Sequence, residues 1–158
     1  MKFLSRCALL AASCTLAAAA WAQPVTVADV KYDETTSVGG STLQLNGAGV
    51  RYKAVFKVYI AGLYLEKKTE TARDVAALKG PKRMSITMLR EIDSTELGKL
   101  FSRGMEDNMD RAAFSKLIPG VLRMSQIFSD HKKLQAGDQF TIDWIPGTGT
   151  VITVKGKP

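Results

Sequence analysis

The sequence has little cysteine and histidine, and this shortage excludes several kinds of site. Its two cysteines, Cys7 and Cys14, both lie within residues 1–22, which have the features of a removable signal. Without that segment the chain has no thiol, which excludes a disulfide framework, a cysteine metal site and a cysteine nucleophile. His131 is the only histidine, so a histidine-based triad or a multi-histidine metal centre is excluded too. We expect His131 to be a solvated loop residue, and we expect no metal and no cofactor.

The sequence also lacks the patterns that are typical of nucleotide or nucleic-acid binding. Gly47 and Gly49 do not form a nucleotide loop, because no helix N-terminus follows them to receive a phosphate. The 22 basic residues exceed the 15 acidic ones, giving a net charge of +7, but they are spread along the chain without interleaved aromatic residues. We therefore expect a solvated surface and no nucleic-acid partner. The acidic patch of Asp107 and Asp110, near Glu106, is interpreted in the same way rather than as a calcium site.

Residues 1–22 are typical of a cleavable secretory signal. Lys2 and Arg6 form a basic end, residues 7–20 form an apolar core, and a small-x-small motif ends at Ala22. We therefore predict cleavage after Ala22 and export to the periplasm, as a secreted protein. Cleavage removes two basic residues and no acidic ones, so Lys and Arg fall from 22 to 20 against 15 acids, and the net charge falls from +7 to +5.

The alternative to a cleavable signal is a lipoprotein signal that uses Cys14. The usual leucine three residues earlier is absent, since Ala11 stands there, and the apolar core continues beyond the cysteine. The apolar run is too short for a good membrane-spanning helix, so we expect no stable span after cleavage. Residues 23–158 are predicted to form a single domain, because they suffice for one core and contain no repeat or linker.

Alternating and helical patterns divide this domain into strands and helices. Strands are predicted at residues 25–32, 42–46, 53–65 and 82–89, a helix at 69–78, a second helix from Asp93, an apolar segment at 114–128 that Pro119 breaks or bends, and a hairpin formed by 139–145 and 150–155. Helices grouped between strands that pair with their chain neighbours predict an α+β fold with a largely antiparallel sheet.

The segment that begins at Ile92 is the best local signal of a helix start. Asp93 can cap the helix while Glu96 reaches back, and Ile92 can pack against a residue of the next turn. The helix carries one apolar stripe, formed by Leu97, Leu100, Phe101, Met105 and Met109, which indicates that it lies along a sheet. We interpret the Met and Phe side chains of such stripes as core residues, and a lipid tunnel is the alternative.

The most informative stretch of the chain is residues 47–66. Gly47 and Gly49 supply backbone freedom for a turn, and the segment after them alternates and is rich in β-branched and aromatic residues. Arg51 is therefore predicted where a turn leads into a strand, and its guanidinium can direct paired donors at a carboxylate or phenolate. The alternative is an exposed turn arginine that pairs with any nearby acid. Gly62 predicts a bulge or the close approach of another group.

This stretch resembles the chalcone isomerase family, in particular its bacterial, chalcone isomerase-like branch. The resemblance rests on residues 47–51 (GAGVR) and 57–66 (KVYIAGLYLE), with support from residues 90–92, 105–108, 137–138 and 146–149, and it covers residues 25–157. It implies a large curved antiparallel sheet with helices packed on one face, an open-faced β-sandwich, with the ligand cleft between the two. Members of the family usually continue through another helical segment, so we expect a C-terminally truncated member, and a shortened variant of the family is the alternative.

The family's plant enzymes cyclise a chalcone with the motif arginine, a threonine in the next strand, and a tyrosine and a lysine from a helical region. Carried over by this resemblance, the arginine is Arg51, but the threonine position is Tyr59 and the tyrosine position is Leu97. Lys99 is only loosely placed to replace the lysine, so the enzymatic set is mostly absent. Arg51 with Tyr59 is instead similar to the fatty-acid-binding members, in which this pair holds the ligand carboxylate. Tyr64 is expected to be structural.

Three hypotheses of function follow. The leading one is an exported, non-catalytic protein that binds a fatty acid or a similar amphipathic carboxylate, with Arg51 and Tyr59 holding the head group. The second is an isomerase, an intramolecular lyase acting on an unknown phenolic substrate, with Arg51 as its electrophile. The third is a protein-interaction module with a vestigial cleft, whose partner the sequence does not identify.

Overall fold

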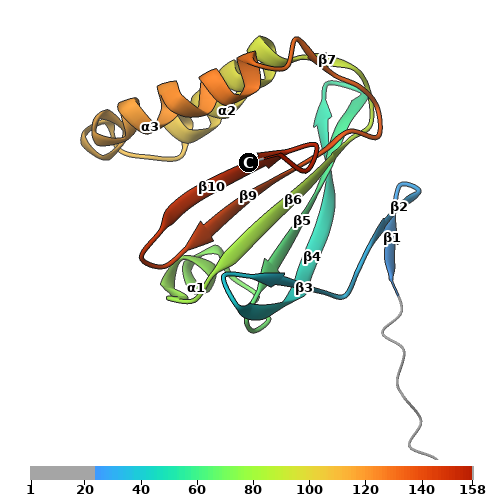
Figure 1. Cartoon of the computed structure of the whole chain (residues 1–158), viewed down its shortest axis with the longest axis vertical. Helices are drawn as coiled ribbons and strands as arrows, with labels where there is room; N and C mark the ends of the chain where they lie inside the picture. Colours follow the sequence, from blue (N-terminus) through green and yellow to red (C-terminus); the bar gives the residue numbers. More distant parts are fainter. Residues whose placement is uncertain (1–23, 158) are drawn as a thin grey trace, which may run out of the picture.

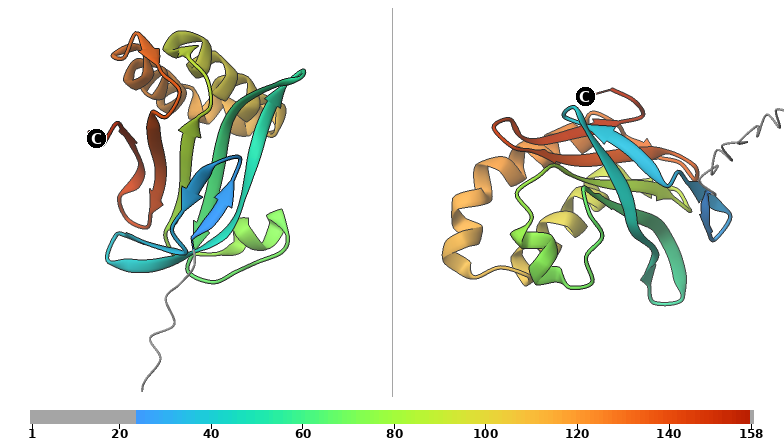
Figure 2. Two further views of the ribbon diagram at one scale, coloured as in Figure 1. Left: turned by 90° about the vertical axis from the view of Figure 1, so that its right-hand side faces the viewer. Right: turned by 90° about the horizontal axis from the view of Figure 1, so that it is seen from below.

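A six-stranded antiparallel sheet forms the centre of the structure, in the strand order β10-β9-β6-β5-β4-β3 (Figure 1). The computed structural model describes residues 24–157, so the predicted signal and its cleavage site lie outside the described residues. The strands of the sheet are β3 (Thr35–Val38), β4 (Ser41–Lys53), β5 (Phe56–Leu65), β6 (Lys82–Met88), β9 (Gln139–Ile145) and β10 (Gly149–Val154). The sheet is strongly curled (Figure 2). The predicted α+β class and antiparallel sheet are confirmed.

Two long helices lie side by side over one face of this sheet (Figure 1). They are α2 (Ser94–Asp107) and α3 (Arg111–Ser129), and a short helix, α1 (Ala72–Ala77), lies between β5 and β6. The short strands β7 (Ile92–Asp93) and β8 (Lys133–Leu134) pair with each other and hold the start of α2 beside the chain that leaves α3. In the described part of the chain no helix is long and apolar enough to cross a bilayer.

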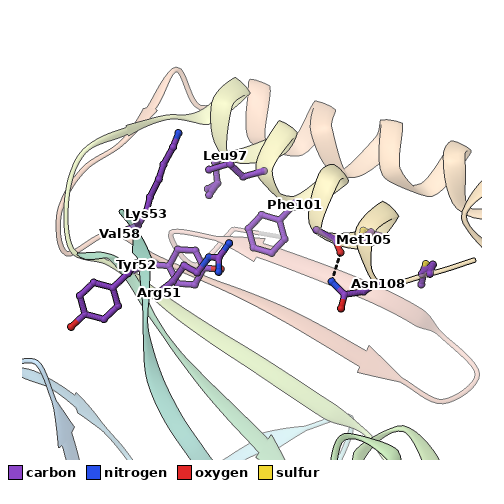
Figure 3. A pocket seen from close by; sticks show the side chains of 12 residues that line it. Arg51, Tyr52, Lys53, Val58, Leu97, Phe101, Met105 and Asn108 are labelled. Atoms are coloured by element: carbon purple, nitrogen blue, oxygen red, sulfur yellow. Dashed lines mark hydrogen bonds between the residues drawn. The ribbon is translucent and has the colours of Figure 1, made fainter. Parts of the chain in front are cut away.

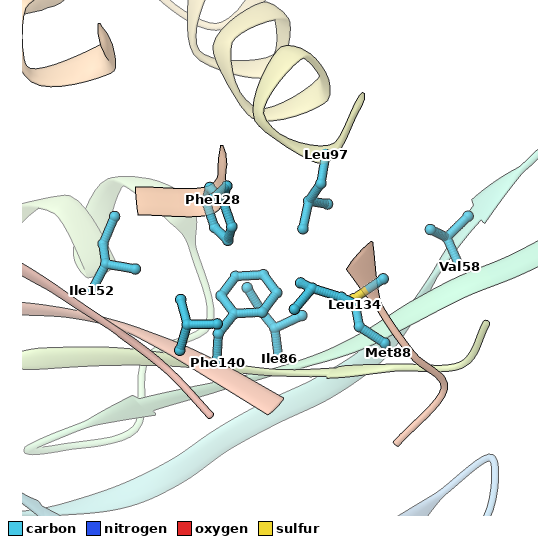
Figure 4. Close-up of a cluster of buried hydrophobic side chains, with 9 residues drawn as sticks. Val58, Ile86, Met88, Leu97, Phe128, Leu134, Phe140 and Ile152 are labelled. Carbon is cyan, nitrogen blue, oxygen red and sulfur yellow. The ribbon is translucent and has the colours of Figure 1, made fainter. Parts of the chain in front are cut away.

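A core of aliphatic and aromatic side chains fills the space between the helices and the sheet (Figure 4). Its buried members are Val58, Ile86, Met88, Leu97, Phe128, Leu134, Phe140, Ile152 and Val154. Each large apolar side chain that leaves water contributes about 1.5–3 kcal/mol to folding. This burial explains why α2 and α3 stay on the sheet.

The opposite face of the sheet is covered by an N-terminal hairpin of β1 (Val25–Val27) and β2 (Val30–Tyr32). The predicted single strand at residues 25–32 is therefore wrong. Ala28 and Asp29 have positive φ values of 43° and 66°, and a two-residue turn of this kind folds the chain back on itself. Its tyrosine lies over Gly62, where an added Cβ would stand 2.7 Å from the ring of Tyr32. The predicted close approach at Gly62 is confirmed.

The strand that carries Arg51 is longer than predicted, and its turn lies elsewhere. The predicted strand at residues 42–46 is only the first part of β4, which continues to Lys53. Gly47 and Gly49 do not form a turn, because both lie inside β4 and neither has a positive φ. The turn to β5 instead uses Ala54, with a φ of 53°. Arg51 therefore lies near the end of a strand rather than at its start.

A bulge in β4 decides which face Arg51 occupies. Leu45 pairs with Tyr64 and Gly47 pairs with Leu63, so Asn46 is an extra residue in the strand. Because side chains alternate along a strand, one extra residue transfers all later residues to the other face. Without it, Arg51 would share the face of Leu45, beneath the N-terminal hairpin. With it, Arg51 lies on the face that the helices cover.

The start of α2 agrees with the sequence pattern, whereas the middle of α3 does not. Asp93 accepts hydrogen bonds from the backbone N–H groups of Thr95 and Glu96, at 2.9 and 3.2 Å, as a helix cap does. Of the predicted break or bend at Pro119, the break is wrong, because α3 is continuous through this residue. Proline removes one backbone hydrogen bond, but burial of Val121 and other residues against neighbouring elements holds the helix together.

Candidate functional site

Arg51 and Tyr59 lie directly opposite each other on the adjacent strands β4 and β5. Directly opposed residues of an antiparallel pair project from the same face, with Cβ atoms about 4.5–5.5 Å apart. The two residues predicted from the sequence are therefore brought together. The register shifts just beyond them, since Tyr52 pairs with Lys57, and the two strands then end at the turn.

The pair lies at one side of a cavity between the β4–β5 hairpin and α2 (Figure 3). The cavity has a volume of about 610 Å³, within the range of about 300–1,000 Å³ that is usual for small-ligand sites. Its apolar lining comes mainly from the predicted stripe, of which Leu97, Leu100, Phe101 and Met105 lie on α2 and Met109 lies just after it. Figure 3 shows Arg51 reaching toward the space beneath α2 while Tyr52 points away from it.

An aromatic column holds the ring of Tyr59 in place. Tyr59 stacks on Phe101 with ring centroids 6.5 Å apart and an angle of 9° between the ring planes. Phe101 stacks in turn on Phe128 of α3, at 5.9 Å, and both rings contact Phe140 of β9 edge-on. Aromatic pairs of this kind contribute about 0.5–1.5 kcal/mol each beyond their buried area. The phenol therefore has a fixed position beside Arg51.

The electrostatics of the cavity favour an anion. Arg51 and Lys53 line it, and no Asp or Glu is among its lining residues. Lys53 also lies 3.6 Å from Glu96, but both side chains are exposed, and such pairs are weak. Burial raises the pKa of Tyr59, and the positive charge of Arg51 acts in the opposite direction. Tyr59 is therefore a neutral hydrogen-bond donor at physiological pH.

A second, shallower groove of about 410 Å³ begins at the same pair and follows β4, β5 and β6 along the same face of the sheet. Part of its floor is made of small residues, Gly47, Gly49 and Ala61, which lie beside the larger Leu63 and Met84. A Cβ added at Gly47 or Gly49 would meet nothing within 4 Å. These glycines are thus not required by packing, and their effect is to leave the floor open.

Sequence reasoning missed two features of the cavity wall. Gly104 lies within α2 and lines the cavity, and a Cβ there would meet no neighbour within 4 Å. Asn108, just after α2, also lines it and donates a hydrogen bond to the carbonyl of Gly104 at 2.8 Å. A glycine inside a strongly amphipathic helix was the available signal, because it is unfavourable there unless space is needed.

The sequence profile of the chalcone isomerase-like family matches residues 24–158. The chain belongs to the chalcone isomerase-like family. Among solved structures it is similar to the crystal structure of a fatty-acid-binding protein of Arabidopsis thaliana, with 14% sequence identity and a TM-score of 0.65. That similarity covers 85% of this chain and 79% of the other. No curated protein sequence matches the chain significantly.

Three other residues considered from the sequence do not add a polar group to the pair of Arg51 and Tyr59 in this chalcone isomerase-like fold. Leu97 is fully buried and contributes only hydrocarbon to the cavity wall. Lys99 is exposed and lines a different depression, near residues of α3, so it does not join Arg51. Tyr64 lies on the opposite face, where its hydroxyl donates a hydrogen bond to the carbonyl of Asp33 at 2.9 Å.

The remaining polar candidates have structural surroundings. Asp110 caps α3 by accepting a hydrogen bond from the backbone N–H of Ala113 at 2.8 Å. His131 follows α3 in the connection to β8, where it is partly exposed. Among residues 24–157 no group of three or more His, Cys, Asp or Glu side chains is placed to hold a metal ion. The cavity beside Arg51 is thus the site with the clearest chemistry.

Proposed function

We propose that this protein binds a fatty acid or a similar amphipathic carboxylate, with its head group held by Arg51 and Tyr59. One observation carries the proposal: these two donors face each other at the side of an apolar cavity that has no acidic lining residue. A guanidinium supplies two parallel charge-assisted donors to a carboxylate, and a phenol adds a neutral third donor without a second charge. The similarity to a fatty-acid-binding protein supports the same ligand class.

The apolar stripe of α2 supports binding of the hydrocarbon chain. Each methylene that leaves water contributes about 0.8 kcal/mol, so a long chain outweighs the head-group contacts in total free energy. Methionine side chains such as Met105 and Met109 adapt to irregular, flexible ligands. Head-group donors at one side and hydrocarbon along the helix make the cavity amphipathic in the same sense as the proposed ligand.

The isomerase hypothesis has less support. An isomerase of this family needs hydroxyl and lysine groups near the motif arginine, and Leu97 and Lys99 do not provide them. Tyr59 faces Arg51 across the strand pair, whereas the ring of Tyr52 points away from the cavity (Figure 3). If turnover of a phenolic substrate were found and survived Arg51→Ala, the version in which Arg51 is the electrophile would be wrong.

Export to the periplasm is a separate part of the proposal. It is supported by the basic end, apolar core and small-x-small motif of residues 1–22. Intact mass measurement of the protein from a periplasmic extract tests it, with Gln23 as the expected first residue. A protein that retains residues 1–22 in the cytoplasm would contradict export and leave the ligand proposal unaffected.

The ligand is tested by native mass spectrometry of the purified protein, followed by extraction of bound lipid and calorimetric titration with palmitate. Arg51→Ala is compared with Arg103→Ala, which removes the same charge from the exposed face of α2. We expect Arg51→Ala to weaken palmitate binding about tenfold to a hundredfold, the loss typical of a charge-assisted hydrogen-bonded pair. Arg103→Ala should bind as the wild type does.

Two outcomes would contradict the proposal. A wild-type protein that carries no lipid and binds no palmitate would favour an interaction role with a vestigial cleft. Equal loss of binding in Arg51→Ala and Arg103→Ala would show a general effect of charge rather than a head-group site. Circular dichroism melts of both variants confirm that any loss of binding is not a loss of folding.

A further inference from the structure

The end of the β4–β5 hairpin exposes large apolar side chains. We define the hairpin tip as residues 52–57. Val55 is 82% exposed, Phe56 58% and Tyr52 49%, the first of these being the largest exposure among the large hydrophobic residues. Figure 2 shows the turn between β4 and β5 projecting beyond the rest of the sheet. Exposed aliphatic and aromatic residues gathered at a projecting turn indicate an interaction surface.

Four basic side chains lie at the hairpin tip or next to it. Residues 47–65 contain Arg51, Lys53 and Lys57 and no Asp or Glu. Arg90 adds a fourth cation, with its guanidinium carbon 5.1 Å from the centre of the Phe56 ring. Among the ion pairs of residues 24–157, only Lys53 of these four has a carboxylate partner, and that pair is exposed. Glu91, Asp93 and Glu96 line a depression beside Phe56 and Arg90, but Glu91 pairs with Lys133, Glu96 pairs with Lys53 and Asp93 caps α2. The tip therefore combines an apolar end with a cationic collar.

We propose that the hairpin tip docks on an anionic lipid surface. Val55 and Phe56 would enter the boundary between head groups and acyl chains, as the apolar faces of interfacial helices do at a depth of about 5–10 Å. Tyr52 suits the same boundary, because its ring is apolar and its hydroxyl is polar. The cations of the collar would then lie among the lipid phosphates, where each basic residue contributes about 1 kcal/mol of attraction.

The geometry connects this surface to the cavity. Arg51 lies three residues from Ala54 in the turn, a distance of about 10 Å along an extended strand. When the tip is inserted, Arg51 and the side of the cavity next to it stand at the level of the head groups. An amphipathic carboxylate could then pass from the lipid to Arg51 without crossing bulk water. This transfer step rests on the proposed function, whereas docking itself does not.

A lipid surface explains the tip better than a protein partner does. A stable protein interface needs about 800 Å² from each partner, and the apolar part of the tip is a turn with three large side chains. Insertion into a bilayer needs only a few such side chains together with electrostatic attraction. The absence of acidic residues in residues 47–65 matches an anionic surface of any composition rather than one protein sequence.

Docking is tested by co-sedimentation of the protein with phosphatidylcholine vesicles that contain or lack phosphatidylglycerol. We expect the wild type to bind the anionic vesicles, to bind neutral ones weakly, and to dissociate as salt is added. Val55→Asp should weaken binding about tenfold or more, the loss expected for one fully buried aliphatic side chain. Lys57→Gln should weaken it about fivefold, the effect of one basic residue near the surface.

Two controls match Val55→Asp in the charge they introduce. Thr148→Asp places a carboxylate in the exposed turn between β9 and β10, and Leu122→Asp replaces an apolar residue of α3 that is 65% exposed. Both should leave vesicle binding close to that of the wild type. The variant Val55→Trp gives a direct signal, because its fluorescence should shift to the blue and be quenched by brominated lipid when the tip inserts.

Three results would overturn docking: no sedimentation of the wild type with anionic vesicles, equal loss in Val55→Asp and Leu122→Asp, or a Val55→Trp signal that vesicles do not change. If the wild type self-associates but does not bind vesicles, and Val55→Asp abolishes the self-association, a protein interface replaces docking on lipid. Palmitate titration of Val55→Asp in lipid-free buffer separates the two proposals. If Val55→Asp binds palmitate as the wild type does but no longer binds vesicles, docking is supported. If the wild type binds vesicles but does not bind palmitate, only the proposed ligand is contradicted.

Discussion

Arg51 and Tyr59 face each other across β4 and β5, and the ring of Tyr59 is stacked on Phe101 of α2. The strand pair fixes where the two side chains emerge, and the helix fixes the plane of the phenol. Three elements of the fold therefore determine one pair of donors.

The hydroxyl of Tyr59 is expected to contribute to affinity and not to stability. Tyr59→Phe removes one neutral hydrogen bond to the ligand, so palmitate affinity should fall about fivefold, or about 1 kcal/mol. Tyr64→Phe is the matched control, because its buried hydroxyl bonds the carbonyl of Asp33 on the other face. It should lower the free energy of unfolding by about 1 kcal/mol and leave affinity unchanged. If calorimetry shows that Tyr59→Phe binds palmitate as tightly as the wild type, the hydroxyl of Tyr59 does not contact the ligand.

Gly104 is expected to keep the cavity open at the cost of helix stability. Gly104→Leu should raise the free energy of unfolding by about 0.5–1 kcal/mol through helix propensity. The new side chain would occupy space next to α2 and displace about two methylenes of the ligand, which weakens binding about tenfold. Gly120→Leu in α3 is the control, since its Cβ also meets nothing within 4 Å and it does not line the cavity.

Thermal melts and palmitate titration measure the stability and the affinity of Gly104→Leu and Gly120→Leu. Gly49→Leu extends the test to the shallower groove on β4. If Gly49→Leu weakens binding and Gly104→Leu does not, the hydrocarbon chain follows the sheet rather than α2. If neither Gly49→Leu nor Gly104→Leu changes palmitate affinity, the hydrocarbon chain of the ligand lies in neither groove, and the proposed ligand position is wrong.

Alkaline pH is expected to weaken both the fold and ligand binding. Burial raises the pKa of Tyr32, Tyr59 and Tyr64 above its usual value, and the neighbouring Asp33 raises that of Tyr64 further. These tyrosines therefore ionise first in the unfolded chain, so their contribution to the free energy of unfolding is constant below a pH of about 10 and falls above it. Denaturant unfolding at a series of pH values measures this decline.

Palmitate affinity should follow the same alkaline limit, because an ionised Tyr59 can no longer donate and adds a negative charge beside the carboxylate. In Tyr59→Phe the affinity should be lower but should lack this decline. An affinity that falls with pH equally in the wild type and in Tyr59→Phe would assign the decline to another group.

Gly62 is expected to tolerate no side chain. A Cβ there would stand 2.7 Å from the ring of Tyr32, so Gly62→Ala should lower the free energy of unfolding by about 1–3 kcal/mol. Gly49→Ala is the control, since its Cβ meets nothing and alanine costs less backbone entropy than glycine. Chemical denaturation of both variants measures the difference. A neutral effect at Gly62 would show that the N-terminal hairpin does not pack on this face.

Much of the fold could be predicted because its signals are local. The cap at Asp93, the stripe that begins at Leu97 and the turn of residues 146–149 each depend on neighbours in the chain, and all are found in the structure. The motif around Arg51 likewise predicted the family. The errors arose where tertiary contacts override local preference, as at Pro119, or where non-glycine residues adopt positive φ, as at Ala28 and Ala54.

The sequence by itself determined the family, the kind of strand that carries Arg51 and the apolar residues available to meet it. It did not determine the face on which Arg51 emerges. That depends on the extra residue Asn46, whose side chain accepts a hydrogen bond from the backbone N–H of Thr69 at 2.7 Å. A bulge is fixed by the partner strand and by contacts distant in sequence, and one inserted residue reverses the alternation of every residue after it. Only the assembled sheet therefore decided that Arg51 and Tyr59 border a cavity beneath α2.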